Sequence, residues 1–242
     1  LNIFWGLDLT FFLTILKSSI CEQIKCEPFY SLYRGINDYS CEMRNVFEEP
    51  VEATSVDFNH FELKVDSDAQ IFLVRNLENK ENTKYYPSNV CSFLVNLQLF
   101  ALYSPEVLEI KREIFTGCEK LVEILLKYFK FNKLEDDLFA DMPKLESISI
   151  YGSGLEILQK NIFQNNPQLR EISIVSNKLK IIAVEFSSNL TVLSLLDNKC
   201  IDAKYKHDDN RSLPLKQVIK KVEENCRNSS TIQPPILESP DE

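Results

Sequence analysis

The chain has little of the material from which catalytic and phosphate-binding sites are built. Its 242 residues include five glycines and two histidines. No G-x-G-x-x-G or P-loop pattern is present to hold a phosphate group. Neither His60 nor His207 lies near a G-x-S-x-G turn or another plausible nucleophile. The seven cysteines contain no CxxC pair of the kind that binds zinc. These absences argue against an enzyme and predict no cofactor and no metal.

Positive charge is also in the minority. The formal net charge is −9 at pH 7. Nucleic-acid binding rests largely on neutralising phosphates with Lys and Arg, so we expect no nucleic-acid partner. The one short basic run, which includes Lys216, Lys220 and Lys221, follows Pro214 and is interpreted as the solvated side of a short helix.

Five hydrophobic triplets with the spacing LxxLxL occupy the middle of the chain. They are Leu94, Leu97, Leu99; Leu121, Ile124, Leu126; Leu145, Ile148, Ile150; Leu169, Ile172, Ile174; and Leu190, Leu193, Leu195. They begin 27, 24, 24 and 21 residues apart, a period typical of a stacked repeat. Side chains alternate along a strand, so the last two residues of a triplet face one side. Stacking buries that side as a continuous core. After two strands, Asn177 and Asn198 are expected to bond backbone groups at the turn.

This pattern resembles a leucine-rich repeat domain, and the segments with Cys26 and Cys41 and with Cys200 and Cys226 resemble those of small secreted insect proteins of that family. The resemblance implies an α/β solenoid: an arc with a parallel β-sheet on its concave side and about six coils. An N-terminal β cap and a C-terminal helical cap would close its ends. Members of the family mostly bind proteins, which implies a recognition module.

The chain divides accordingly into five predicted segments. Residues 1–21 are expected to be a signal peptide, 22–70 the N-terminal cap, 71–199 the repeats, 200–226 the C-terminal cap and 227–242 a disordered tail. The leader is apolar from Ile3 to Leu16 and is followed by the small residues Ser18 and Ser19. An uncleaved signal anchor is the alternative, although the run falls short of the roughly 20 apolar residues of a span. We expect a secreted, extracellular protein without a membrane span in the mature chain.

Removal of the leader takes Cys21 and leaves six cysteines, an even number that indicates disulfides in an exported protein. Cys91 and Cys118 each stand three residues before a triplet on adjacent coils, which predicts a bridge between them. Cys26 with Cys41 would then close the N-terminal cap, and Cys200 with Cys226 the C-terminal cap. Sequons predict glycosylation of Asn189, Asn210 and Asn228, and support export weakly.

The strand positions that face away from the core form the predicted binding surface. The triplet register predicts that the partner-binding residues are Phe100, Glu123, Lys127, Tyr151, Glu171, Val175 and Leu196. Exposed aromatic and aliphatic groups in a row are typical of a partner site. The sequence therefore predicts a non-enzymatic module that binds a protein, or a glycan, through the concave face. The alternative is a structural or matrix component that assembles through its edges and disulfides.

Overall fold

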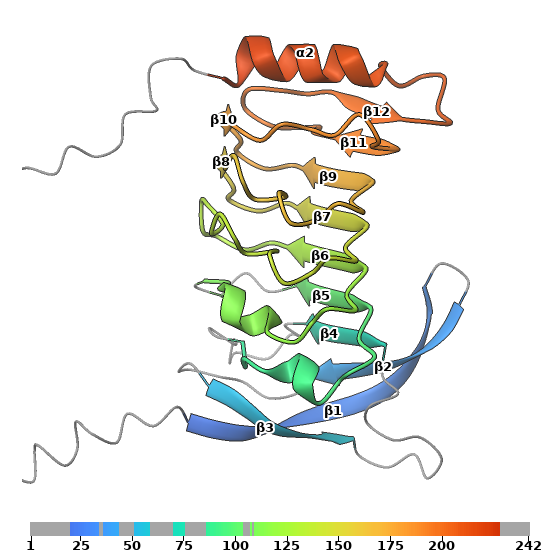
Figure 1. Cartoon of the computed structure of the whole chain (residues 1–242), viewed down its shortest axis with the longest axis vertical. Coiled ribbons are helices and arrows are strands. Elements are labelled where there is room, and N and C mark those ends of the chain that lie inside the picture. The colour runs from blue at the N-terminus through green and yellow to red at the C-terminus, as the bar shows by residue number, and fades with distance from the viewer. Residues whose placement is uncertain are drawn as a thin grey trace, which may run out of the picture.

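The computed structural model describes residues 20–33, 36–43, 51–58, 70–75, 86–103, 107 and 109–227. These residues form a parallel β-solenoid that a group of strands closes at one end and a helix at the other (Figure 1). The predicted leader and tail lie almost entirely outside this part of the chain, although Ile20 and Cys21 already belong to the first strand. No helix within the described ranges is long and apolar enough to span a membrane.

One sheet runs along the whole stack. Its described strands are β1 (Ile20–Tyr33), β2 (Ile36–Met43), β3 (Val51–Phe58), β4 (Ile71–Arg75), β5 (Leu99–Tyr103), β6 (Glu123–Lys127), β7 (Ser147–Tyr151), β9 (Glu171–Val175), β11 (Val192–Ser194) and β12 (Lys204–Lys206). Their spatial order is β12-β11-β9-β7-β6-β5-β4-β2-β1-β3, and the pairs from β4 to β11 are parallel. Two short strands, β8 (Ile157–Leu158) and β10 (Ile181–Ile182), pair on the opposite side of the solenoid (Figure 1).

The core lies between these two sides. Leu121, Leu145 and Leu169 begin successive coils and are all buried, and the strand residues after them point inward at every second position. Leu158 and Ile182 close the core from the side of the short strands. Four turns connect β5 to β11, and β4 adds a further strand to the same sheet. The predicted solenoid, with a parallel sheet along one side, is confirmed.

The register of the first repeat differs from the prediction. Phe100 lies opposite Ile124, so the true triplet is Leu97, Phe100 and Leu102, 24 residues before the next. The predicted triplet began at Leu94 and was wrong by three residues, because leucines at that spacing also satisfy LxxLxL. A shift by an odd number of residues moves every side chain to the other face of a strand.

A left-handed residue follows each of four strands. Tyr128, Gly152, Ser176 and Asp197 have φ values of 68°, 60°, 54° and 53°. After Ser176, the Asn177 side-chain amide donates to the carbonyls of Ile150 at 3.0 Å and Val175 at 2.9 Å.

Asn198 occupies the equivalent place on the next coil. Its side-chain amide donates to the Ile174 carbonyl at 2.7 Å and also to the carbonyls of Leu195 and Leu196. The expected role of both asparagines is confirmed, since each side-chain amide donates to backbone carbonyls where the chain leaves the strand.

The ends of the solenoid carry disulfides and caps. The structure contains the expected bridges Cys91–Cys118 and Cys200–Cys226, with Cα atoms 5.1 Å and 5.3 Å apart. Helix α2 (Leu215–Asn225) buries Val218 and Val222, and it covers the last coil (Figure 1). At the other end β1 pairs with β2 in antiparallel and with β3 in parallel orientation. Cys41 is disulfide-bonded. Its predicted pairing with Cys26 stays a prediction, because the Cys26 side chain lies outside the described residues.

Candidate functional site

The outer face of the sheet, meaning the face turned away from the core, presents three columns of side chains. The first is Leu99, Glu123, Ser147, Glu171 and Val192; the second is Ala101, Leu125, Ser149, Ser173 and Ser194; the third is Tyr103, Lys127, Tyr151 and Val175, followed by Leu196 after β11. Neighbouring members of a column are about 4.8 Å apart in the hydrogen-bonding direction. In the later coils the second column consists of serines, so the side chains along the middle of the face are short.

Phe100 does not belong to this face, and its assignment as a partner-binding residue was wrong. Its side chain is 3% exposed. Its ring packs edge-on against Phe115, with the centroids 5.1 Å apart. Tyr103 takes the place in the third column that the sequence register gave to Phe100. The regular spacing of 24 residues between repeats is the signal that could have identified it.

The other predicted residues lie on this face. Lys127 and Tyr151 are adjacent across the β6–β7 pair, and Val175 is opposite Tyr151 on β9. Glu123 and Glu171 lie in the first column, at the other end of their strands. Glu123 is buried and Glu171 is half-buried, and both have interaction partners. The structure therefore separates the predicted acidic residues from the predicted aromatic ones.

Four side chains gather at the carboxyl ends of β5, β6 and β7. We call Tyr103, Lys127, Tyr128 and Tyr151 the tyrosine–lysine cluster. The Lys127 ammonium lies 4.9 Å from the centre of the Tyr103 ring and 5.9 Å from that of Tyr151. The Tyr128 and Tyr151 rings meet nearly perpendicular, 6.1 Å apart. These two tyrosines are 49% and 41% exposed, whereas most large apolar side chains of the described residues are buried or half-buried.

The backbone explains how Tyr128 comes to be exposed. It is the first left-handed residue of the series, and it lies where the chain leaves β6. A bulky residue with positive φ is uncommon and costs conformational energy of about 1–3 kcal/mol. The next coil has Gly152 at the equivalent place, and a Cβ atom there would come within 3.1 Å of the Tyr128 ring. Gly152 thus provides the space that the Tyr128 ring occupies, which sequence reasoning missed.

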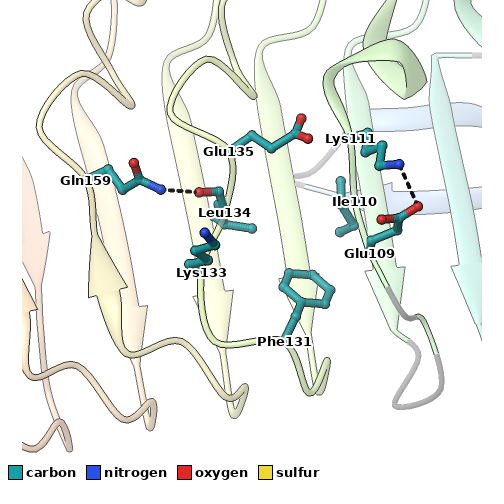
Figure 2. Close-up of a pocket in the computed structure, with 8 residues that line it drawn as sticks. All are labelled: Glu109, Ile110, Lys111, Phe131, Lys133, Leu134, Glu135 and Gln159. Carbon is teal, nitrogen blue, oxygen red and sulfur yellow. Dashed lines mark hydrogen bonds and ion pairs between the residues drawn. The ribbon is translucent and has the colours of Figure 1, made fainter. Parts of the chain in front are cut away.

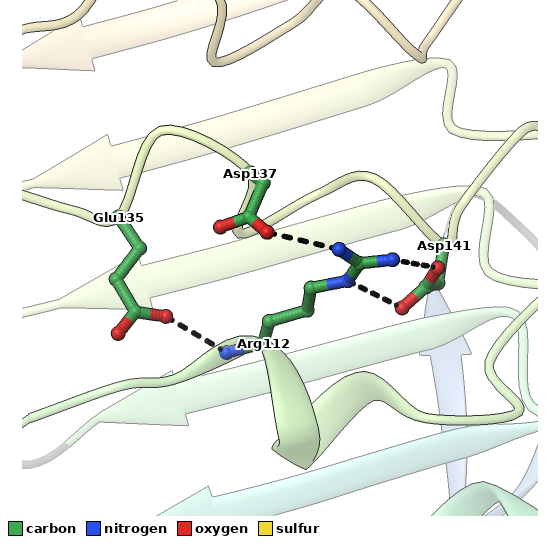
Figure 3. A network of polar contacts seen from close by, with 4 residues as sticks. All are labelled: Arg112, Glu135, Asp137 and Asp141. Atoms are coloured by element: carbon green, nitrogen blue, oxygen red, sulfur yellow. Dashed lines mark hydrogen bonds and ion pairs between the residues drawn. The ribbon is translucent and has the colours of Figure 1, made fainter.

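A charged cavity lies on the other side of the solenoid, near the 3₁₀ helix η3 (Arg112–Phe115). It has a volume of about 440 Å³, and Figure 3 shows Arg112 reaching from η3 to the next coil. The guanidinium donates twice to Asp141, at 2.8 Å and 2.7 Å, and once to Asp137, at 2.9 Å. The Arg112 backbone amide donates to Glu135. Arg112 lowers the pKa of Asp141 below its usual value, chiefly by side-chain hydrogen bonding. This network ties two coils together and leaves the guanidinium occupied.

A smaller pocket of about 190 Å³ lies beside it, in the groove between coils (Figure 2). Lys111 pairs with Glu109 at 2.9 Å, and Gln159 donates to the Leu134 carbonyl at 2.8 Å. Its polar groups therefore bond mainly to one another. In the ranges that the structure describes, no group of three or more His, Cys, Asp or Glu side chains could hold a metal ion.

Comparison with known proteins agrees with the fold. Residues 84–199 match the family model of the BspA type leucine-rich repeat region, in six copies. No curated protein matches the chain. The matched range begins before β5 and ends after β11, so it contains the whole tyrosine–lysine cluster.

Proposed function

We propose that the chain is a leucine-rich repeat protein and acts as a non-enzymatic module that binds a partner protein through the outer face of its sheet. The match of residues 84–199 to a family model of such repeats supports this proposal. The repeat architecture is that of a protein-interaction scaffold, whose rigid surface exists before the partner arrives. Preformed surfaces lose little conformational entropy on binding. The proposal also specifies which face of the solenoid binds the partner.

One observation carries that choice. Tyr128 and Tyr151 are exposed aromatic side chains that lie side by side. Tyrosine supplies a large contact area with a polar group at its tip, and aromatic residues dominate the energetics of interfaces. Val175 continues the row as a half-buried aliphatic residue. These larger side chains lie beside a middle column of small serines, an arrangement that favours a protein as the partner.

Blocking the face tests the proposal. Ser149 lies in the middle column, between Leu125 and Ser173 on the neighbouring strands. We expect Ser149→Arg to weaken binding of the partner at least about tenfold, because the long side chain would occupy the contact surface. The partner is first recovered on immobilised full-length chain and identified by mass spectrometry. Its affinity for each purified variant is then measured by calorimetry.

The matched control for this experiment is Gln164→Arg, which adds the same side chain at an exposed position outside the sheet. It should leave the affinity unchanged. Loss of binding with Gln164→Arg and not with Ser149→Arg would place the interface on the other side of the solenoid and contradict the proposal.

We also propose that the protein is secreted and glycosylated. Two disulfides in the described residues are compatible with an oxidising compartment. The side chains of Asn189 and Asn210 are exposed, while Asn228 lies outside the described residues. We expect protein expressed in insect cells to appear in the medium without free thiols and to lose mass on treatment with an N-glycosidase. Intracellular retention with reduced cysteines would contradict this proposal.

A further inference from the structure

Lys127 has an unusual position within the tyrosine–lysine cluster. Its side chain is half-buried, and its ammonium lies against the rings of Tyr103 and Tyr151. The part of the chain that the structure describes offers this ammonium no carboxylate partner. Other basic side chains of the described residues, such as Arg112 and Lys180, pair with an acidic residue. An ammonium that is held between two rings keeps three N–H donors, and the ring faces accept none of them as strongly as an anion would.

The described acidic residues of the same face, Glu123 and Glu171, are too distant to neutralise it. Glu123 lies on the same strand, four residues before Lys127. Four residues of strand span about 13 Å, which exceeds the Debye length of about 8 Å at physiological ionic strength. Glu171 lies two strands away, also in the first column. The cluster is therefore a local positive site beside exposed aromatic rings.

The overall charge restricts the kind of anion that can approach. A net charge of −9 repels a long polyanion such as a sulfated glycan. A single carboxylate, flanked by neutral groups, meets much less of that repulsion because salt screens the remaining charges. The exposed rings of Tyr128 and Tyr151 offer an apolar surface for the group next to that carboxylate.

We propose that the tyrosine–lysine cluster binds an acidic peptide segment of the partner protein. One Asp or Glu carboxylate of the segment accepts a hydrogen bond from Lys127 Nζ. A neighbouring aromatic or aliphatic side chain packs against Tyr128 and Tyr151. Among the described residues, Lys127 has no ion pair that would have to break for this contact to form. The inference rests on the proposed function, and it adds the chemistry of the partner to it.

A library of short random peptides, selected for binding to the full-length chain, tests the inference. We expect selected peptides to combine Asp or Glu with an adjacent aromatic or aliphatic residue. Lys127→Met keeps most of the apolar stem and removes the ammonium, and it should lower the affinity of these peptides about tenfold or more. Lys127→Arg keeps the charge and can stack on the rings, so it should retain most of the binding. Lys144→Met changes an exposed lysine before β7 and should have no effect.

Several outcomes would overturn the inference. They are selected peptides without acidic residues, equal affinity for wild type and Lys127→Met, no selection at all, and binding of a sulfated oligosaccharide that Lys127→Met abolishes in place of peptide binding. Failure here is distinguishable from failure of the proposed function. If Ser149→Arg abolishes binding of the partner protein while Lys127→Met does not, the outer face remains the interface and only the acidic segment is rejected.

Discussion

Replacing Phe100 with alanine should lower the free energy of unfolding by about 3–5 kcal/mol, the usual cost of removing a buried phenylalanine. The ring is almost completely buried. It contacts the rings of Phe72, Tyr86 and Phe115, with centroid distances of 5.8, 6.3 and 5.1 Å. The first coil therefore loses the centre of an aromatic cluster, and the surrounding rings cannot collapse fully into the cavity. Denaturant unfolding of the purified variant measures this loss.

Tyr103→Ala is the matched control for that experiment. Tyr103 is an aromatic residue on the same strand, but it points to the outer face and is half-buried. We expect a smaller loss of stability, together with weaker partner binding. The reverse result, a stable Phe100→Ala variant that no longer binds, would mean that Phe100 faces outward and that the register of β5 is wrong.

Removing the disulfide of the C-terminal cap should cost about 3–4 kcal/mol. The Cys200–Cys226 bridge joins residues separated by 26 positions, and constraint of a loop of that length in the unfolded chain accounts for this magnitude. The double variant Cys200→Ser, Cys226→Ser frees α2, which buries Val218 and Val222 against the last coil. We expect reduced stability in denaturant and fast amide hydrogen exchange in residues 215–226.

The bridge between the first coils provides the comparison. Cys91 and Cys118 are separated by 27 positions, so their removal should cost a similar amount of free energy. This change should leave exchange in α2 slow, because coils of a solenoid contact mainly their neighbours. Slow exchange in α2 without the Cys200–Cys226 bridge would show that packing alone holds the helix.

The sequence predicts the solenoid well because its signal is repeated. Leu121, Leu145 and Leu169 each begin a triplet, and a single incorrect assignment could not change the architecture. The first coil lacked such redundancy. Two overlapping triplets fit the residues around Leu97. The 24-residue spacing favours the one that begins at Leu97, and pairing with β6 confirms it. Because of this error, Phe100 was predicted to lie on the outer face, and Tyr103 was not identified as a residue of that face.

The Cys91–Cys118 bridge was predicted correctly in spite of that error. The residue equivalent to Cys118 in the true register is Leu94, and Cys91 lies three residues earlier, in the 3₁₀ helix η2 (Val90–Ser92). A disulfide accepts a range of Cα separations, and a helical turn brings Cys91 within 5.1 Å. A correct disulfide is therefore weak evidence for the register of a repeat.

Tyr128 illustrates what a periodic pattern cannot provide. Its exposure depends on a left-handed backbone and on the missing side chain of Gly152, one coil away. Neither feature belongs to the hydrophobic period. The glycine at the equivalent place was visible in the sequence, but its meaning depends on which coils are adjacent in space.

The last strand of the sheet, β12, affects whether molecules can join end to end through their sheets. β12 runs antiparallel to β11, and its outer edge is already occupied: Leu213 donates its amide to the Lys204 carbonyl, and the Lys206 amide donates to the Ser212 hydroxyl. An open strand edge is the template on which sheets elongate from molecule to molecule. In the part of the chain that the structure describes, this end offers no such template, so a concentrated solution should not polymerise into fibres through it.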